Sequence, residues 1–386
     1  MAGLCTAGRA DAQPAHLAPG EASHGAIEAE PPTVEVLTFG VGDRIFEKFG
    51  HAALCLQYRD PQHPAVCFNY GVTDFDAGPA MIWDFLRSRQ KFWVEPTSFR
   101  SMFSFYQRED RDIWQQTLPL TGEQARAIEA KLWFDIEEKH RYYNYDHFFD
   151  NCATRVRDVI DAATGGALRA GTDARYPLTF REIGRRGLAD MPALLVLTDL
   201  MIGRQADEDP TVWQAMFHPD VVRQQLQVRL GAEPRLLYKR RGPGFPTDGP
   251  SGRFEVMLLA LACTLPLVLA QWRGRFETAA LVLATLWLVL LGAIVWGPAM
   301  VSSIAGVRYN EALLVAVPLD AALPFLRRHL RRRYALVRVV VIVLTSLLAA
   351  IGIFHQPLWL VSAAVFLPMI TIALNLPTGL AGRRHV

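Results

Sequence analysis

The chain has little excess charge of either sign and few cysteines. Its 40 Lys and Arg residues nearly balance 38 Asp and Glu residues, so the net charge is +2. No basic stripe interleaved with aromatic side chains is present, which argues against a nucleic-acid partner. The five cysteines show no Cys-x-x-Cys spacing and no His-Glu-x-x-His motif occurs, so the usual zinc signatures are missing. The sequence therefore predicts no metal and no cofactor.

Acidic residues are almost absent from the C-terminal third of the chain. Residues 254–376 are mostly apolar, whereas residues 33–240 are rich in Trp, Tyr and Phe and carry charges of both signs. A chain of 386 residues is also too long for one compact domain. We therefore expect a soluble domain followed by an all-α membrane domain, residues 254–380, of about five spans. The candidate spans are residues 254–270, 278–296, 311–326, 336–354 and 358–376.

Basic residues are unevenly distributed among the loops that join these candidate spans. The loops after the second and fourth spans carry only Arg308 and His355. The loops after the first and third spans and the C-terminal tail hold Arg273, Arg275, Arg327, Arg328, Arg331, Arg332, Arg333, Arg383 and Arg384. Because basic loops stay in the cytoplasm, we expect a multi-pass inner-membrane protein with a cytoplasmic C-terminus and residues 33–240 in the periplasm.

The N-terminal residues 1–32 hold no complete signal peptide. The run Gly8-Arg-Ala-Asp-Ala-Gln resembles the small-residue end of one, with cleavage expected after Ala12 and the apolar core upstream of the given start. The rest of this stretch is rich in Ala, Pro, His and Glu and is expected to be a disordered linker. Residues 241–253 form a second linker before the membrane domain.

Residues 33–240 show the pattern of an α+β domain, a small sheet with helices around it. Strands are expected at 34–39 and 112–118, with a β-hairpin at 51–70. The helices are expected at residues 79–89, 99–107, 121–139 and 153–163 and through much of 177–230.

Cys152 is the first candidate for chemistry. Residues 153–163 have apolar positions at helical spacing, and Asp150 or Asn151 is suited to cap that helix. The thiol would then lie in the first helical turn, where backbone N–H groups and the helix dipole favour an anion. We therefore expect a lowered thiol pKa and a nucleophilic cysteine. The alternative is a small core residue, since free cysteine is among the most buried residue types.

His51 and Asn69 are the candidate partners of this thiol. If the hairpin register pairs residue 58 with 64, residue 51 faces 71, and His51 becomes a diagonal neighbour of Asn69 on one face. Asn69 could then orient the imidazole in a Cys-His-Asn set, although asparagine is also a common turn residue at strand ends. A weaker alternative makes Cys152 a metal ligand with His147 and His140.

The same register places Cys55 opposite Cys67. A cross-strand disulfide is then possible in an oxidising periplasm, and two small core residues are equally possible. Cys152 would remain the unpaired thiol of this domain.

Four segments together resemble the Lnb-type periplasmic domain family. They are Val34-Glu-Val-Leu-Thr-Phe-Gly-Val-Gly-Asp, Phe49-Gly-His-Ala-Ala-Leu, Phe68-Asn-Tyr-Gly-Val-Thr-Asp-Phe and Tyr142-Tyr-Asn-Tyr-Asp-His-Phe-Phe-Asp-Asn-Cys-Ala-Thr-Arg-Val-Arg-Asp. The resemblance implies a permuted papain-like core in which His51, Asn69, Asn151 and Cys152 form the catalytic set. It also implies a lipoprotein N-acyltransferase-like activity, with bacterial lipoproteins and membrane phospholipids as partners.

Three functions are compatible with these residues. The first is a Cys-His acyltransferase that forms a thioester at Cys152, with backbone N–H groups near Asn151 and Cys152 holding the oxyanion. The second is a periplasmic cysteine peptidase or amidase, and the third is a non-catalytic binding module. Asp320, inside the third candidate span, departs from the family pattern. A carboxylate there is expected either to pair with an arginine or face a polar cavity, or to lie near the headgroups at the end of a shorter span.

Overall fold

The computed structural model describes residues 30–74, 79–249 and 251–374, and these form two compact units. The first unit holds the described residues up to Met81, Gln90–Tyr176 and Pro210–Phe245. The second holds Ile82–Arg89, Pro177–Asp209 and the described residues from Pro246 onward, so part of the 33–240 stretch clusters with the apolar C-terminal segments. The expected cleavage after Ala12 and the basic tail at Arg383 and Arg384 lie outside the described residues.

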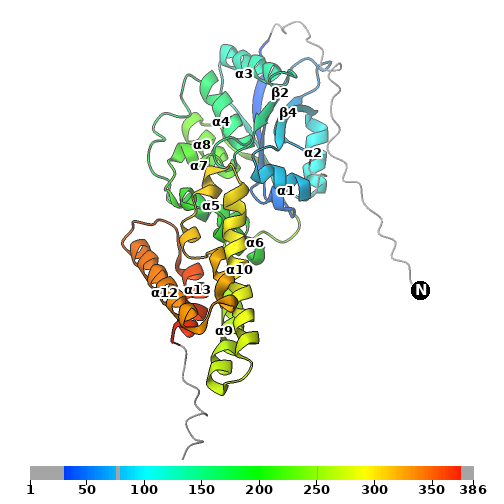
Figure 1. Ribbon diagram of the computed structural model, residues 1–386. Helices are drawn as coiled ribbons and strands as arrows, with labels where there is room; N and C mark the ends of the chain where they lie inside the picture. The colour runs from blue at the N-terminus through cyan, green and yellow to red at the C-terminus, as the bar shows by residue number, and fades with distance from the viewer. Residues whose placement is uncertain (1–29, 75–78, 250, 375–386) are drawn as a thin grey trace, which may run out of the picture. The chain divides into compact units, whose positions relative to one another are not determined.

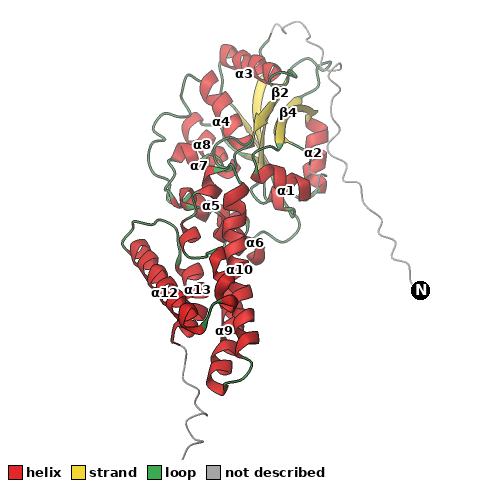
Figure 2. Ribbon diagram, in the orientation of Figure 1, coloured by secondary structure: helices red, strands yellow, loops and turns green. Residues whose placement is uncertain are grey.

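The first unit is built on one antiparallel sheet (Figures 1 and 2). Its order is β6-β4-β3-β2-β1-β5-β7. The strands are β1 Thr33–Phe39, β2 His51–Gln57, β3 Val66–Val72, β4 Lys91–Ser98, β5 Ile113–Thr117, β6 Tyr142–Asn144 and β7 Arg235–Tyr238. Six of the seven β1 residues are buried. Helices cover both faces of the sheet, so buried and exposed residues need not alternate along this strand.

Helices of the first unit lie on either side of this sheet, as Figure 2 shows for α2, α3 and α4. Helix α2, Phe99–Arg108, packs on β3, β4 and β5, whereas α4, Cys152–Ala163, packs on β2 and β3. The remaining elements are α3 Gly122–Asp135, α7 Val212–Ala215, α8 Pro219–Leu230 and the short η1 Ile45–Glu47. Helix α1, Pro79–Leu86, divides between the two units.

The predicted elements agree with the structure where the signal is local. The strands at 34–39 and 112–118, the hairpin and the helices at 79–89, 99–107 and 153–163 are all present. Thr121 and Gln124 form a capping box at the start of the helix predicted from residue 121, but α3 ends at Asp135 and not at residue 139. Strands β4, β6 and β7 escaped prediction because β4 contains Pro96 and the other two have only three and four residues.

The hairpin register is the predicted one. Cys55 lies opposite Cys67, and the two form a disulfide, which decides between the two expectations for this pair. The β2–β3 ladder ends at Leu54 and Phe68, although β3 continues to pair with β4. The first three residues of β2 are therefore not paired to β3, and this opening is where α4 packs.

Among its described residues, the second unit contains three helices that are long and apolar enough to cross a membrane. They are α9 Arg253–Arg273, α10 Glu277–Val301 and α12 Arg328–Ala350. Helix α13, Trp359–Leu374, is apolar but has 16 residues within the described part of the chain. The other elements of this unit are α5 Phe180–Gly187, α6 Pro192–Met201, η3 Arg204–Asp207, α11 Ala305–Arg308, η4 Glu311–Leu314 and η5 Pro318–Phe325.

The third predicted span, residues 311–326, is wrong as a helix. The structure has two short 3-10 turns there, η4 and η5, because Pro318 and Pro324 remove backbone donors that a continuous helix would need. The segment instead packs along α10, where Gly292 allows a close approach: a Cβ at Gly292 would lie 3.3 Å from the Pro318 nitrogen.

Asp320 is paired with an arginine, as one of the two expectations had it. Arg338 of α12 donates from Nε to Asp320 Oδ1 at 3.0 Å, and Tyr334 Oη donates to the same oxygen at 2.7 Å. Arg338 also donates to the backbone carbonyl oxygens of Leu314 and Val315. Arg338 thus donates hydrogen bonds to carbonyl oxygens that lack a helical partner, as an apolar setting requires.

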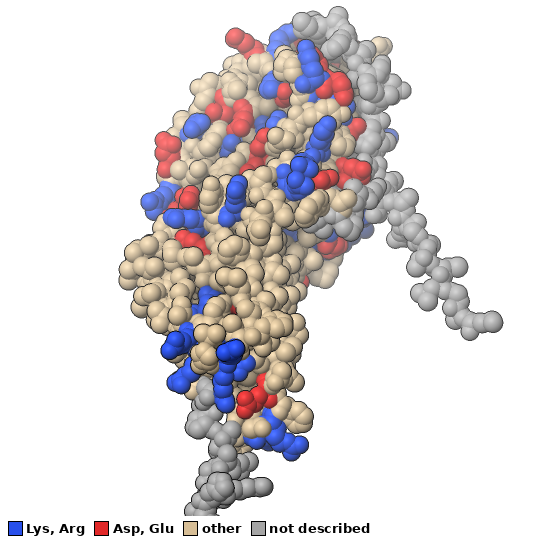
Figure 3. Space-filling model, viewed as in Figure 1, with Lys and Arg blue, Asp and Glu red and all other residues tan. Residues whose placement is uncertain are grey.

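The basic loops of the second unit lie at the same end. Arg275 lies two residues before α10, which begins at Glu277, and Arg331 at the start of α12 interacts electrostatically with Glu277. Arg332 donates to the Ala373 carbonyl at 3.0 Å near the end of α13. Figure 3 shows Lys and Arg side chains gathered beyond a band of surface that has almost no charge.

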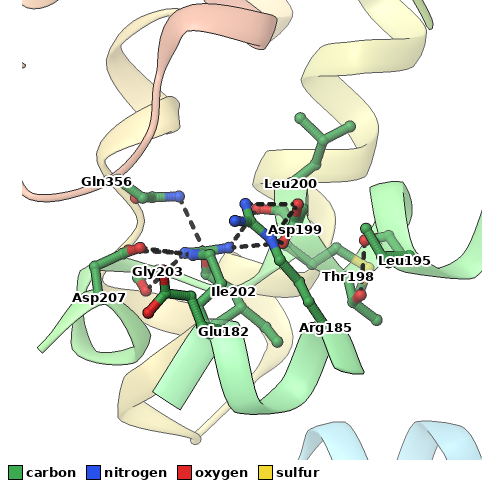
Figure 4. A network of polar contacts seen from close by, with 12 residues as sticks. Glu182, Arg185, Leu195, Thr198, Asp199, Leu200, Ile202, Gly203, Asp207 and Gln356 are labelled. Carbon is green, nitrogen blue, oxygen red and sulfur yellow. Dashed lines mark hydrogen bonds and ion pairs between the residues drawn. The ribbon is translucent and has the colours of Figure 1, made fainter. Parts of the chain in front are cut away.

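A buried polar network joins the helices of residues 177–209 to the loop before α13 (Figure 4). Arg181 donates to both carboxylate oxygens of Asp207, at 2.7 and 2.9 Å, and to the Ile202 carbonyl at 2.8 Å. Gln356 donates to the same Ile202 carbonyl at 3.0 Å, and Arg185 pairs with Asp199. These contacts explain why residues 177–209 belong to the second unit.

Candidate functional site

Cys152 is the first residue of α4. Asn151 is the N-cap, and its Oδ1 accepts a hydrogen bond from the Thr154 backbone N–H at 3.0 Å. The expected cap is therefore present, and the thiol lies in the first helical turn. Cys152 is a free cysteine that is partly exposed as a whole residue, although its thiol group is desolvated by its surroundings, whereas Cys55 and Cys67 are joined in a disulfide.

Asn151 positions the helix start through all of its polar groups. Its Nδ2 donates to the His147 carbonyl at 2.7 Å and to the Phe217 carbonyl at 3.0 Å, while its backbone N–H donates to Thr154 Oγ1 at 2.8 Å. The Asn151 backbone N–H is thus already engaged within the helix cap. The backbone N–H groups of Cys152 and Ala153, which lie beside the sulfur, are the donors left in this turn.

His51 and Asn69 meet as the hairpin register predicts. The His51 Nε2 and the Asn69 Oδ1 are hydrogen-bonded across the open end of β2 and β3. Because a carbonyl oxygen can only accept, Nε2 carries the proton in the neutral ring and Nδ1 keeps a lone pair. This is the tautomer that a general base requires, with Asn69 as the group that holds it.

The strand that carries His51 also touches the nucleophile. The backbone N–H of Ala52 lies within hydrogen-bonding reach of the Cys152 sulfur, and α4 packs on β2 and β3. Gly71 of β3 adjoins the same thiol, since a Cβ there would lie 3.8 Å from Cys152 Cβ. The structure therefore places Cys152 against Ala52 and Gly71, on the two strands that carry the bonded pair of His51 and Asn69.

The thiol is not in the state that the sequence predicted. Burial raises the pKa of Cys152 above its ordinary value of 9.0, although hydrogen bonds from the backbone N–H groups of Ala52, Ala153 and Cys152 act in the opposite direction. Burial also lowers the pKa of His51 to about 4, and the nearby Arg111 adds to this. The expectation of a lowered thiol pKa is wrong, because desolvation outweighs the helix start. The resting pair is a neutral thiol beside a neutral imidazole.

Two groups near the site were not singled out from the sequence. Tyr106 of α2 lies with its ring centroid 6.1 Å from that of His51 in a stacked arrangement. The Arg111 guanidinium lies 4.7 Å from the Tyr106 centroid and donates to the Gly40 carbonyl at 2.8 Å. Arg111 is buried, and its electrostatic effect favours the Cys152 thiolate and disfavours a charged His51. Only long-range packing reveals it, since its sequence position indicates an ordinary surface loop.

The histidines of the metal alternative lie in different surroundings. His147 packs against the ring of Phe49, with centroids 4.4 Å apart, and burial lowers its pKa to about 4. His140 stacks on Phe134 at 3.7 Å. Among the described residues, no group of three His, Cys, Asp or Glu side chains could hold a metal ion. His147 therefore serves as a packed aromatic ring in the loop before α4.

Residues 22–186 match the family model described as the Lnb N-terminal periplasmic domain. The matched region includes His51, Asn69, Asn151 and Cys152. No curated protein and no solved structure matches the chain. The part of the chain that carries this site is therefore similar to the Lnb N-terminal periplasmic domain, and the Lnb family is supported for it.

Proposed function

We propose that this protein is a membrane-anchored Cys-His acyltransferase that acts on lipid or lipoprotein acyl chains through a thioester at Cys152. The observation that carries the proposal is the hydrogen-bonded pair of His51 and Asn69 on the strands against which the start of α4 packs. A nucleophile, a base and a group that orients the base are the three parts of a covalent acyl-transfer site. The proposal includes a permuted papain-like arrangement of these parts.

The first half-reaction begins from the neutral pair. His51 Nδ1 takes the proton of Cys152 Sγ while the sulfur attacks the ester carbonyl carbon, and the carbonyl electron pair moves onto oxygen. Asn69 holds the ring through Nε2 and stabilises the imidazolium that forms. When the tetrahedral intermediate collapses, the C–O bond breaks and the imidazolium returns its proton to the leaving alkoxide. The products are an acyl-Cys152 thioester and a lyso lipid.

The second half-reaction regenerates the thiol. An amine attacks the thioester carbonyl, His51 takes a proton from the attacking nitrogen, and the C–S bond breaks to give an amide and a Cys152 thiolate that recovers the proton. Water in place of the amine would make the protein a hydrolase with the same residues. The proposed acceptor is the N-terminal amine of a bacterial lipoprotein and the proposed donor is a membrane phospholipid.

Two observations favour an acyl substrate over a peptide. The described residues include three apolar helices long enough to cross a membrane, which would hold the site near lipid esters. Large apolar side chains are also exposed on the segments that lead into the site: Ile45, Phe46 and Phe149 are 42, 48 and 42 % exposed. Exposed apolar groups of this size are suited to contact an acyl chain. We place the first unit in the periplasm, with the C-terminus in the cytoplasm and the spans in the inner membrane.

The test compares the full-length protein with Cys152→Ala and His51→Ala after expression in a host membrane. Mass spectrometry should find an acyl group on Cys152 that is absent from Cys152→Ala, together with changed acylation of co-expressed lipoproteins. Released fatty acid without a changed lipoprotein would indicate a lipase. An unmodified Cys152 and identical lipoproteins in all three samples would reject acyl transfer and favour the peptidase or the binding module.

A further inference from the structure

Tyr143 presents a buried hydroxyl group that has no hydrogen-bond partner within the part of the chain that the structure describes. The residue lies at the centre of β6 and is 9 % exposed, whereas its neighbour Tyr142 is 47 % exposed. A buried hydroxyl group without a partner loses the hydrogen bonds that it makes with water. Native structures rarely keep such a group unless something binds to it or it takes part in chemistry.

The free hydroxyl group lies beside the nucleophile. Gly71 separates the two: a Cβ at Gly71 would be 3.7 Å from Tyr143 Oη and 3.8 Å from Cys152 Cβ. Gly71 has a φ of +90°, a conformation that other residues rarely adopt, and it lies where the β3–β4 register shifts. The absence of a side chain at this position leaves space between the hydroxyl group and the thiol.

The Tyr143 ring is held in place by the helix that carries Cys152. The Arg155 guanidinium lies over the ring at 3.7 Å from its centroid, one turn of α4 after the thiol. Arg155 is itself fixed by two hydrogen bonds to Asp150, at 2.7 and 2.9 Å. The hydroxyl group therefore keeps a defined position relative to α4, as an electrostatic donor to a reacting group requires.

We infer that Tyr143 is a catalytic residue that donates its hydroxyl hydrogen bond to the oxyanion formed when Cys152 attacks an acyl carbonyl. This inference rests on the proposed acyl transfer. When the S–C bond forms, the carbonyl electron pair moves onto oxygen, and Tyr143 and the Cys152 backbone N–H donate to that oxygen while keeping their protons. Burial, and a negative charge on Cys152, raise the pKa of Tyr143 well above 10.0, so the group stays a donor throughout.

The experiment uses the purified full-length protein in detergent and two reagents. A p-nitrophenyl octanoate ester reports acylation of Cys152, which passes through an oxyanion. Iodoacetamide reports alkylation of the same thiol by direct displacement, which does not. Tyr143→Phe keeps the ring under Arg155 and removes only the hydroxyl group, and Tyr142→Phe makes the same change on the exposed neighbour.

Tyr143→Phe should lower the acylation rate by about 10²–10³-fold, the loss typical of one oxyanion donor, with its alkylation rate unchanged. Tyr142→Phe should match the wild type with both reagents. Equal acylation rates for Tyr143→Phe and wild type, with the signal lost in Cys152→Ala, would overturn this inference alone. A parallel loss of acylation and alkylation would also overturn it, because it would assign Tyr143 a structural role. Wild-type protein that reacts no faster with the ester than Cys152→Ala would overturn the inference and the proposed function together.

Discussion

The backbone N–H of Ala52 lies within hydrogen-bonding reach of the sulfur of Cys152, so the strand that begins with His51 adjoins the nucleophile. This contact is possible because the β2–β3 ladder ends at Leu54 and Phe68 and leaves the start of β2 free on that side. The Ala52 N–H thus links the open start of β2 to the start of α4. These two elements also carry the base, His51, and the thiol, Cys152.

Asn69→Ala should lower acyl-Cys152 formation by about 10²–10⁴-fold, because the His51 ring loses the acceptor that fixes its tautomer. Melting temperature should change little, since Asn69 is partly exposed. Asn69→Asp is the matched variant, because it keeps an acceptor for Nε2 and should retain more activity than alanine. Equal rates for Asn69→Ala and wild type would contradict the role assigned to this residue.

The reactivity of Cys152 should rise steeply with pH. Because burial raises the thiol pKa, the thiolate fraction at pH 7 is smaller than that of an exposed cysteine, and iodoacetamide alkylation should keep increasing beyond pH 9. Arg111→Met should shift the alkylation profile to still higher pH, since the guanidinium favours the thiolate. An alkylation profile that levels off near neutral pH would show a preformed thiolate and contradict the neutral resting pair.

Stability should fall as the pH is lowered from 6.5 toward 4. His51 and His147 each have a folded-state pKa of about 4, against 6.5 in the unfolded chain. The unfolded chain therefore binds more protons in this window, and acid stabilises it relative to the folded state. Each histidine should account for about 2 kcal/mol between pH 7 and pH 5. His147→Phe preserves the packing on Phe49 and should remove about half of the loss, measured by thermal unfolding in detergent. An unchanged pH dependence in this variant would reject the role of His147.

Reduction of the disulfide between Cys55 and Cys67 should destabilise the first unit without removing the site. A loop closed over 12 residues corresponds to about 3 kcal/mol of unfolded-state entropy. The double variant Cys55→Ala and Cys67→Ala should melt at a lower temperature and still alkylate at Cys152. Peptide mass spectrometry of the non-reduced protein should recover the Cys55–Cys67 pair, and a disulfide that includes Cys152 would contradict the proposed mechanism.

Removing one member of the Asp320–Arg338 pair should be more harmful than removing both. Arg338→Met leaves a buried carboxylate without its cation and should cost about 3–5 kcal/mol. The double variant Asp320→Leu and Arg338→Met avoids that unpaired charge but loses the donors to Leu314 and Val315, so an intermediate melting temperature is expected. Equal melting of the single variant and wild type would show that the pair is not structural.

Local patterns explain which parts could be predicted from the sequence. The apolar spacing of α4, its Asn151 cap and the hairpin register depend on residues close together in the chain, and these predictions agree with the structure. The prediction of the third span was wrong because the segment is as apolar as a membrane span, but its two prolines prevent a continuous helix. Strands β4, β6 and β7 depend on partners far along the chain, and short segments carry too little periodic signal of their own.

The sequence by itself determined the candidate residues Cys152, His51 and Asn69, the uneven charge between the two parts of the chain and the capped start of α4. Only the tertiary structure decided the state of the thiol, because its pKa depends on how much water the neighbouring β2 and β3 remove and not on the helix start alone. It also decided that Tyr143 and Arg111 adjoin the site, since their positions follow from sheet pairing and packing over long sequence distances. Helix capping and apolar spacing depend on neighbouring residues, whereas desolvation arises only when distant segments come together.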